Sequence, residues 1–178
     1  MYENKILYGL DKIHICGLDK IIRPLTGALN IEINLEQEYQ YAKSQGYDVY
    51  RFNGAMKGKG KLTVLNLTLE EQSWLFGYKH KNGELSVDGK FSPPPLSLLF
   101  ARQKADKGEI YTVAYKCIFK NPGINGRTHQ GEMEEDTLSL EFDVLRDMNK
   151  ELTYFSLDTK DPTSNKDKVD NFFKEIQI

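Results

Sequence analysis

The sequence predicts a mainly β protein: an antiparallel β-sandwich or barrel with one flanking α-helix, a long loop or arm, and a short C-terminal helix. Alternating apolar and polar residues recur in short segments that are bounded by glycine-containing turns. One segment of the body has both the start signal and the stop signal of a helix. Helical patterns do not alternate with the strands, which argues against a parallel sheet.

Period-two alternation marks the strands. It places Ile31, Ile33 and Leu35 on one face of a strand, and the segment 62–67 is apolar on both faces, as a covered central strand would be. Further strands are predicted at 110–119, 138–144 and 152–157, with shorter candidates at 85–87 and 96–101. In 110–119 one face is expected to carry Tyr111, Val113, Tyr115, Cys117 and Phe119. In 138–144 the inward positions are Leu138, Leu140, Phe142 and Val144.

Turn signals between these strands predict antiparallel hairpins. They lie at 81–83, 87–89, 106–108 and 125–126, and the proline run 93–95 is expected at a sheet edge, at the start of a strand or in a loop. The glycine-rich run 57–61 is predicted to form a hairpin turn. It is not a phosphate-binding loop, because a strand and not a helix N-terminus follows it.

The single well-marked helix of the body begins after 62–67. Thr68 and Glu71 have the spacing of a capping box, in which each side chain bonds the other residue's backbone N–H. Gly77 stands where a left-handed residue ends a helix. These signals predict a helix over about eight residues that flanks the sheets.

The segment 36–60 has no sustained period and is longer than an ordinary loop. It is rich in side chains that are favoured in protein interfaces, which are Tyr39, Tyr41, Tyr47, Tyr50, Arg51 and Phe52. The preferred interpretation is an extended loop that contacts another subunit. The alternative is a loop that folds back over its own core.

The segment 158–178 forms a C-terminal extension to a domain that spans 1–157. Its first part is polar, and its last part carries Val169, Phe172, Phe173 and Ile176 at the spacing of a short amphipathic helix. Such a helix needs a surface to bury against. The sequence leaves open whether that surface belongs to the same chain or to a neighbour.

Composition disfavours several function classes. The formal net charge of −2 lacks the basic excess of a general nucleic-acid binder, and no apolar run is long enough to suggest a membrane partner. Cys16 and Cys117 are expected to be reduced and buried. The histidines are scattered, and the acidic cluster Glu132, Glu134, Glu135 and Asp136 lacks the spacing of a calcium loop. We therefore expect no enzyme activity, no cofactor and no metal.

The order of these landmarks resembles that of the phage major tail protein family, the tail tube subunits of phages with long, flexible tails. The similar segments are 4–9, 13–15, 24–33, 58–77, 95–101, 111–119, 120–122 and 137–142. The resemblance covers roughly residues 4 to 157, and the most typical stretch is 58–77, a strand followed by a short helix and a glycine.

The resemblance implies a structural virion protein with a tail tube fold. Six copies would form a ring, and stacked rings would form a conduit through which DNA passes without sequence-specific binding. It further implies synthesis in the host bacterial cytoplasm, a final place in the virion tail, and contacts with the tape measure, terminator and initiator proteins. Two alternatives remain: a carbohydrate- or ligand-binding β-sandwich of a baseplate or decoration protein, and the inner tube of a contractile injection system or gene-transfer particle.

Overall fold

The computed structural model describes residues 2–90, 92–124, 126 and 136–177, and it confirms the mainly β, antiparallel class. The strands are β1 (Leu7–Cys16), β2 (Ile22–Pro24), β3 (Ala28–Ser44), β4 (Tyr47–Val64), β5 (Lys79–Lys81), β6 (Glu84–Ser86), β7 (Leu96–Lys104), β8 (Glu109–Phe119), β9 (Leu138–Val144) and β10 (Tyr154–Asp158). The helices are the 3-10 turn η1 (Glu3–Lys5), α1 (Leu69–Phe76) and α2 (Lys166–Asn171).

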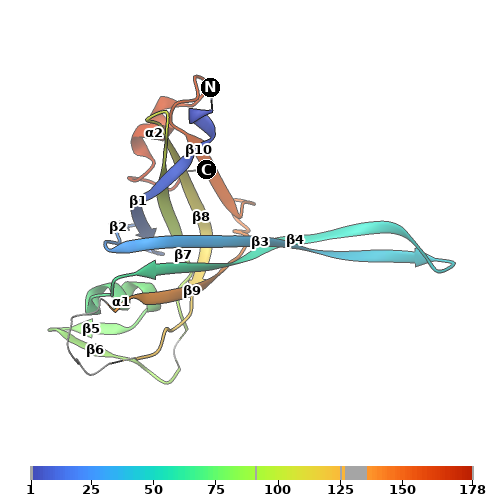
Figure 1. Ribbon diagram of the computed structural model, residues 1–178. Helices are drawn as coiled ribbons and strands as arrows, with labels where there is room; N and C mark the ends of the chain where they lie inside the picture. Colours follow the sequence, from blue (N-terminus) through green and yellow to red (C-terminus); the bar gives the residue numbers. More distant parts are fainter. Residues whose placement is uncertain (1, 91, 125, 127–135, 178) are drawn as a thin grey trace.

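The large sheet folds over on itself into two layers. Its strands follow the order β2-β1-β7-β8-β9-β4-β3, β10 adds to β8, and β5 and β6 form a separate hairpin. In Figure 1, β3 and β4 run across the direction of β1, β7 and β8. Apolar side chains from β3, β7, β8 and β9 meet between the layers, which makes the core of a sandwich.

Strand β8 belongs to both layers. Residues 110–114 of β8 pair with β10, whereas residues 117–119 pair with β9. A bulge separates the two parts, and Lys116 there has a positive φ of 25°. Because an extra residue shifts the alternation of a strand, Tyr111 and Tyr115 face a second apolar cluster while Phe119 faces the main core. The prediction that all five apolar residues of 110–119 share one face is therefore wrong.

The glycine-rich run 57–61 lies inside β4 and not in a turn, which corrects the sequence prediction. Strand β4 is central here, because it pairs with β3 on one side and with β9 on the other. A Cβ atom added to Gly60 would lie 2.1 Å from Cζ of the fully buried Phe142. The glycine therefore leaves space for an aromatic ring to cover the strand.

The predicted helix is confirmed as α1, with the predicted cap. The Thr68 N–H donates to the Glu71 carboxylate at 2.7 Å, and the Glu71 N–H donates to Oγ1 of Thr68 at 3.2 Å. Gly77 ends the helix with a φ of 76°. Leu75 and Phe76 are buried in the main core, so the helix covers one end of the sandwich.

The C-terminal extension packs against its own chain. Helix α2 is shorter than predicted and ends at Asn171, and the turn after it carries Phe172, which is fully buried. The ring centroid of Phe172 lies 5.1 Å from that of Tyr111 in β8. The hydroxyl of Tyr115 donates to the carbonyl of Gln177 at 2.6 Å. The surface that the sequence left unassigned is thus the outer side of β7 and β8.

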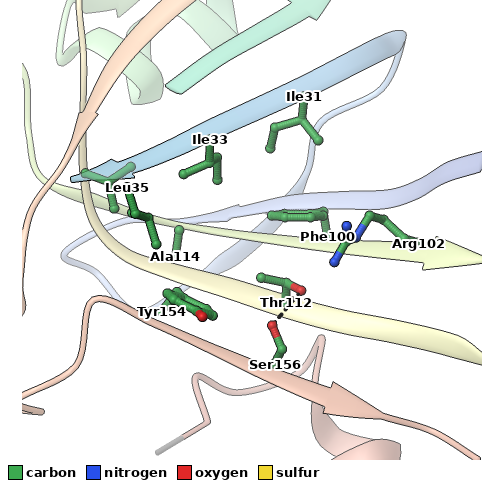
Figure 2. Close-up of a pocket in the computed structure, with 10 residues that line it drawn as sticks. Ile31, Ile33, Leu35, Phe100, Arg102, Thr112, Ala114, Tyr154 and Ser156 are labelled. Carbon is green, nitrogen blue, oxygen red and sulfur yellow. Dashed lines mark hydrogen bonds between the residues drawn. The ribbon is translucent and has the colours of Figure 1, made fainter. Parts of the chain in front are cut away.

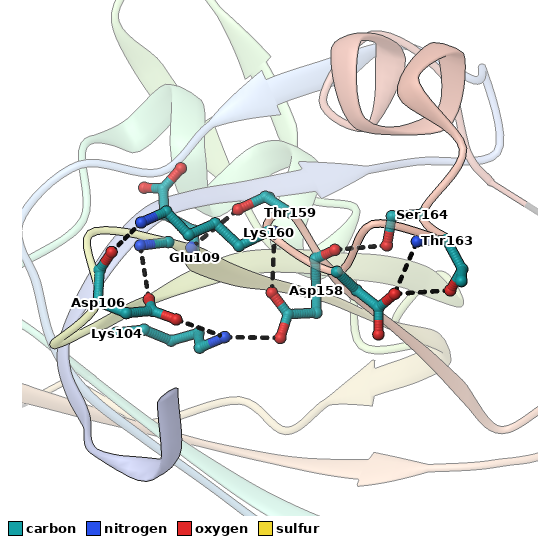
Figure 3. Close-up of polar contacts among 10 residues, drawn as sticks. Lys104, Asp106, Glu109, Asp158, Thr159, Lys160, Thr163 and Ser164 are labelled. Atoms are coloured by element: carbon teal, nitrogen blue, oxygen red, sulfur yellow. Dashed lines mark hydrogen bonds and ion pairs between the residues drawn. The ribbon is translucent and has the colours of Figure 1, made fainter. Parts of the chain in front are cut away.

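Polar contacts join this extension to the turn between β7 and β8 (Figure 3). The Lys104 ammonium is buried, and its Nζ lies 2.7 Å from Asp158 and 3.1 Å from Asp106. The Glu109 N–H donates to Oγ1 of Thr159 at 2.9 Å, and Lys160 donates to the carbonyl of Asp106. The boundary predicted after residue 157 therefore falls within β10, in a region that is tied to the body on both sides.

Candidate functional site

The outer halves of β3 and β4 form an arm that extends away from the body (Figure 1). The ladder runs from the core end, Ala28 opposite Val64, to the tip, Ser44 opposite Tyr47, with three register shifts along it. The segment 36–60, predicted as a loop, is thus a β-hairpin. Its period was hidden because neither face of the ribbon is buried, so neither face is uniformly apolar, and because two register shifts interrupt the alternation on β4.

The aromatic residues of the arm lie on two faces. The register places Tyr39, Tyr41 and Arg51 on one face and Tyr47, Tyr50 and Phe52 on the other. On the first face the guanidinium of Arg51 lies 4.4 Å from the ring centroid of Tyr39. On the second the rings of Tyr50 and Phe52 meet edge to face at 4.8 Å. All six interface candidates are therefore brought together, but in two sets.

These side chains are exposed to solvent. The exposed fractions are 46% for Tyr39, 52% for Tyr41, 76% for Tyr47, 63% for Tyr50 and 54% for Phe52. The arm therefore does not fold back over its own core, which was the alternative left by the sequence. Exposed aromatic side chains gathered on one projecting element are typical of a surface that binds a partner.

An apolar cleft opens between the two layers (Figure 2), and its β3 side lies just before β3 enters the arm. Its volume is about 240 Å³. Ile31, Ile33 and Leu35 of β3 line one side, and side chains of β7, β8, β9 and β10 line the other. The β3 residues continue outward on the same face as Tyr39 and Tyr41, so one stripe runs from the cleft onto the arm.

Arg102 is the charged group of this cleft (Figure 2). Its Nε is buried and has no hydrogen-bond partner within the described residues. The hydroxyls of Thr112 and Ser156 lie 3.0 Å apart at the same opening and bond each other. A buried guanidinium N–H without an acceptor is costly, so the cleft suits an occupant that brings an oxygen atom together with apolar surface.

The opposite face of the β3, β4 and β9 layer is polar, and we call it the charged face. It is formed by Glu32, Asn34, Glu36, Lys57, Lys59, Lys61, Ser139, Glu141 and Asp143. Lysines of β4 stand between carboxylates of its two neighbours: Lys61 lies opposite Glu32 on one side and Glu141 on the other. A hydrogen bond from Lys57 to Glu38 raises the pKa of that lysine. Each lysine of the charged face thus lies beside a carboxylate.

Both cysteines are buried thiols. Burial raises the pKa of the Cys117 thiol to about 12, and Cys16 is also a free, buried thiol with a raised pKa. Neither forms the thiolate needed of a nucleophile near neutral pH. Among the described residues, no three His, Cys, Asp or Glu side chains are placed to hold a metal ion. Thr68 and Glu71 serve as a helix cap, as predicted.

Sequence reasoning missed the cleft and Arg102. A signal was present, because Arg102 falls on the same face of β7 as Leu98 and Phe100, where an apolar residue is expected. A charged residue that continues an apolar stripe indicates either the end of the core or a binding group. The cleft itself depends on how β3 crosses β7 and β8, which no local pattern encodes.

Comparisons with known proteins do not assign a family. A scan against protein-family models found no match, and a search of curated proteins found none. In the part of the chain that is described, no helix is both long and apolar enough to cross a membrane.

Proposed function

We propose that this protein is a structural subunit that assembles with copies of itself into stacked rings, and that the resulting tube conducts DNA as the phage major tail proteins do. The observation that carries the proposal is the arm: a two-stranded ribbon that extends from a small body and presents exposed aromatic side chains on both faces. A ribbon of this kind is poorly stabilised by its own chain and gains apolar contacts only from a partner.

Sheet edges supply a second argument for self-association. Strand β3 ends the order of the large sheet, and among the strands of the described residues β10 pairs with β8 alone. Each of them keeps one side whose backbone N–H and C=O groups face no strand of the sheet. Such edges pair readily with another chain. A head-to-tail contact between copies closes into a ring when the rotation between subunits allows it.

The charged face suits the wall of a channel for DNA. Its lysines stand beside carboxylates, so the face has no uncompensated basic stripe with which to grip phosphates. Mixed charge with a slight acidic excess lets a polyanion pass without a tight electrostatic hold. The other partners expected from the resemblance, namely the tape measure, terminator and initiator proteins, belong to the same proposal.

Removal of the arm tests the proposal. Residues 39–52 are replaced by Asn-Gly, which suits a two-residue hairpin turn. We expect the full chain to form rings or filaments about 100 Å across at high concentration or with preformed seeds, since that size fits six small domains around a pore. The arm-shortened chain is expected to stay monomeric. Electron microscopy and sedimentation velocity measure the difference.

A matched set of point variants tests whether the arm side chains themselves are needed for assembly, without a change to the core. Tyr47→Ser, Tyr50→Ser and Phe52→Ser together change only exposed side chains, and the control combines Leu18→Ala with Val87→Ala, which are exposed apolar residues of the body. Assembly is expected to be lost in the first set and kept in the control. A wild-type chain that stays monomeric even with seeds would refute the proposal, as would arm variants that assemble normally.

Carbohydrate binding is the second candidate function, and the exposed rings of Tyr47 and Tyr50 favour it because sugars stack on such rings. A glycan array distinguishes the two functions. Defined glycan hits that disappear in Tyr50→Ala, together with failure to assemble, would replace the tube proposal with this one.

A further inference from the structure

We propose that the apolar cleft is the receiving site for the arm of a second copy of this chain, with the hydroxyl of Tyr47 as the acceptor for the guanidinium of Arg102. The inference rests on the proposed self-assembly and names its donor and receiving surfaces. Two surfaces of the same chain have unmet requirements: the arm has exposed aromatic rings, and the cleft has apolar walls and an unpaired N–H.

The chemistry of the cleft fits a tyrosine. Aliphatic and aromatic side chains line most of its wall, among them Ile33 and Phe100, and its volume of about 240 Å³ is of the size of one large side chain. A tyrosine ring fills such a space, and its oxygen satisfies a buried N–H. A phenylalanine would fill the space but leave Nε of Arg102 without an acceptor.

Tyr47 is the most accessible tyrosine of the arm. It has an exposed fraction of 76% and lies at the tip, opposite Ser44. Tyr50 and Phe52 share its face and pack on each other, so they form an apolar platform behind it. The residue opposite Tyr50 on β3 is Ala42, whose small side chain covers little of the Tyr50 ring.

The arm cannot enter the cleft of its own chain. Strand β3 contributes Ile31, Ile33 and Leu35 to the cleft and then continues without interruption into the arm. At about 3.3 Å per residue, the tip lies about 30 Å beyond the last core pairs of the ladder. For the tip to reach the cleft of its own chain, β3 would have to break its pairing with β4. The occupant must therefore come from another copy.

The contact has a defined symmetry. The donor surface and the receiving surface are different parts of the chain, so each copy gives one arm and accepts one arm. Such an exchange is head-to-tail and continues from copy to copy, into a ring or a filament. This property links the cleft to the assembly proposed above.

Site-specific photocrosslinking in full chains tests the inference. The donor is a chain with a benzoylphenylalanine at position 50, which keeps Tyr47. The acceptor is an isotope-labelled chain with residues 39–52 replaced by Asn-Gly, so that it receives an arm but offers none. We expect crosslinks from the donor to map to 31–35 and to Tyr154 or Ser156 of the acceptor, as read by mass spectrometry.

A double-mutant cycle tests the named pair. Tyr47→Phe in the donor and Arg102→Leu in the acceptor are each expected to lower crosslinking about tenfold, the effect of losing a hydrogen bond to a charged group of about 1.4 kcal/mol. Combining them is expected to lower it no further, because both changes remove the same contact. Lys81→Leu in the acceptor, an exposed cation away from the cleft, is the control and should change nothing.

Four outcomes would overturn the inference. Crosslinks that map outside the cleft, additive losses in the cycle, an inert Arg102→Leu or no crosslink between chains would each exclude the cleft as receiver. If arm variants still abolish tube formation in those cases, the proposed function stands without this inference. If chains that never form tubes still crosslink in the cleft, the contact between arm and cleft would be supported and the proposed tube function refuted.

Discussion

At the scale of single residues, Gly60 and Phe142 show how one position decides the packing of a strand. Gly60 lies in the part of β4 that pairs with both β3 and β9, and the ring of Phe142 from β9 occupies the space left by its missing side chain. The ring of Phe142 also lies 4.8 Å from that of Phe119. The glycine is therefore required by the core and not by a turn.

We expect Gly60→Ala to destabilise the protein by about 3 kcal/mol, because a Cβ there overlaps a ring that is itself fully buried. Urea unfolding measures the change. The control is Gly89→Ala, where a Cβ meets no atom within 4 Å. Equal stability of the two variants would show that Phe142 moves aside without cost.

At the scale of elements, the C-terminal extension is held by packing and by charge together. Phe172 enters the apolar cluster beneath it, and Lys104 pairs with acids from two segments. Hydrogen bonds to Asp158 raise the pKa of Lys104, and the backbone N–H of Gly108 lowers the pKa of Asp106. Both shifts favour the charged forms of this network in the folded state.

The network predicts a pH window for stability. Because the pKa of Asp106 is lowered in the folded protein, its ionised carboxylate stabilises the fold at pH values above the ordinary pKa of 3.8. That stabilisation is lost as the pH falls through the pKa that Asp106 has in the folded state. Because the pKa of Lys104 is raised in the folded protein, its ammonium stabilises the fold at pH values below the ordinary pKa of 10.5. That stabilisation is lost as the pH rises through the pKa that Lys104 has in the folded state. In urea unfolding, Lys104→Met should thus differ most from wild type between these limits. A difference that does not change with pH would contradict this.

Elements with a buried face were predictable from sequence, and those without one were not. The stripe in 138–144 predicted β9 because one face meets the core, and Thr68, Glu71 and Gly77 predicted α1 because caps are local. The arm was missed because no burial imposes a pattern on it. The division of 110–119 between two faces was missed because it depends on pairing with two different strands, β10 and β9, that are remote in sequence. The bulge at Lys116 lies between the two paired parts.

At the scale of the whole molecule, the arm and cleft differ in composition from the charged face. The arm and cleft carry exposed apolar groups, whereas the charged face carries interleaved acids and lysines. The exposed aromatic residues were predictable as a set from the sequence. Their division into two faces and their relation to the cleft were not, because both depend on strand register and on the crossing of the layers.

The charged face predicts weak interaction with DNA. Glu32→Lys, Glu141→Lys and Asp143→Lys each raise the net charge of the face by two and remove a partner of the β4 lysines. We expect the triple variant to bind duplex DNA at about 50 mM salt and to lose most of that binding near 200 mM, as counterion release requires. Fluorescence anisotropy measures both proteins. Wild-type binding as tight as that of the variant would contradict a channel role for this face.

The central position of β4 has a consequence for synthesis. Its pairing with β3 joins residues that are close in the chain, so this hairpin can form as soon as both strands have left the ribosome. Its pairing with β9 joins Gly58 to Val144, and β10 completes the second layer only after that. The nascent chain thus exposes the aromatic residues of the arm before the two layers of the body have folded. During that interval, aggregation with other nascent chains is most favoured.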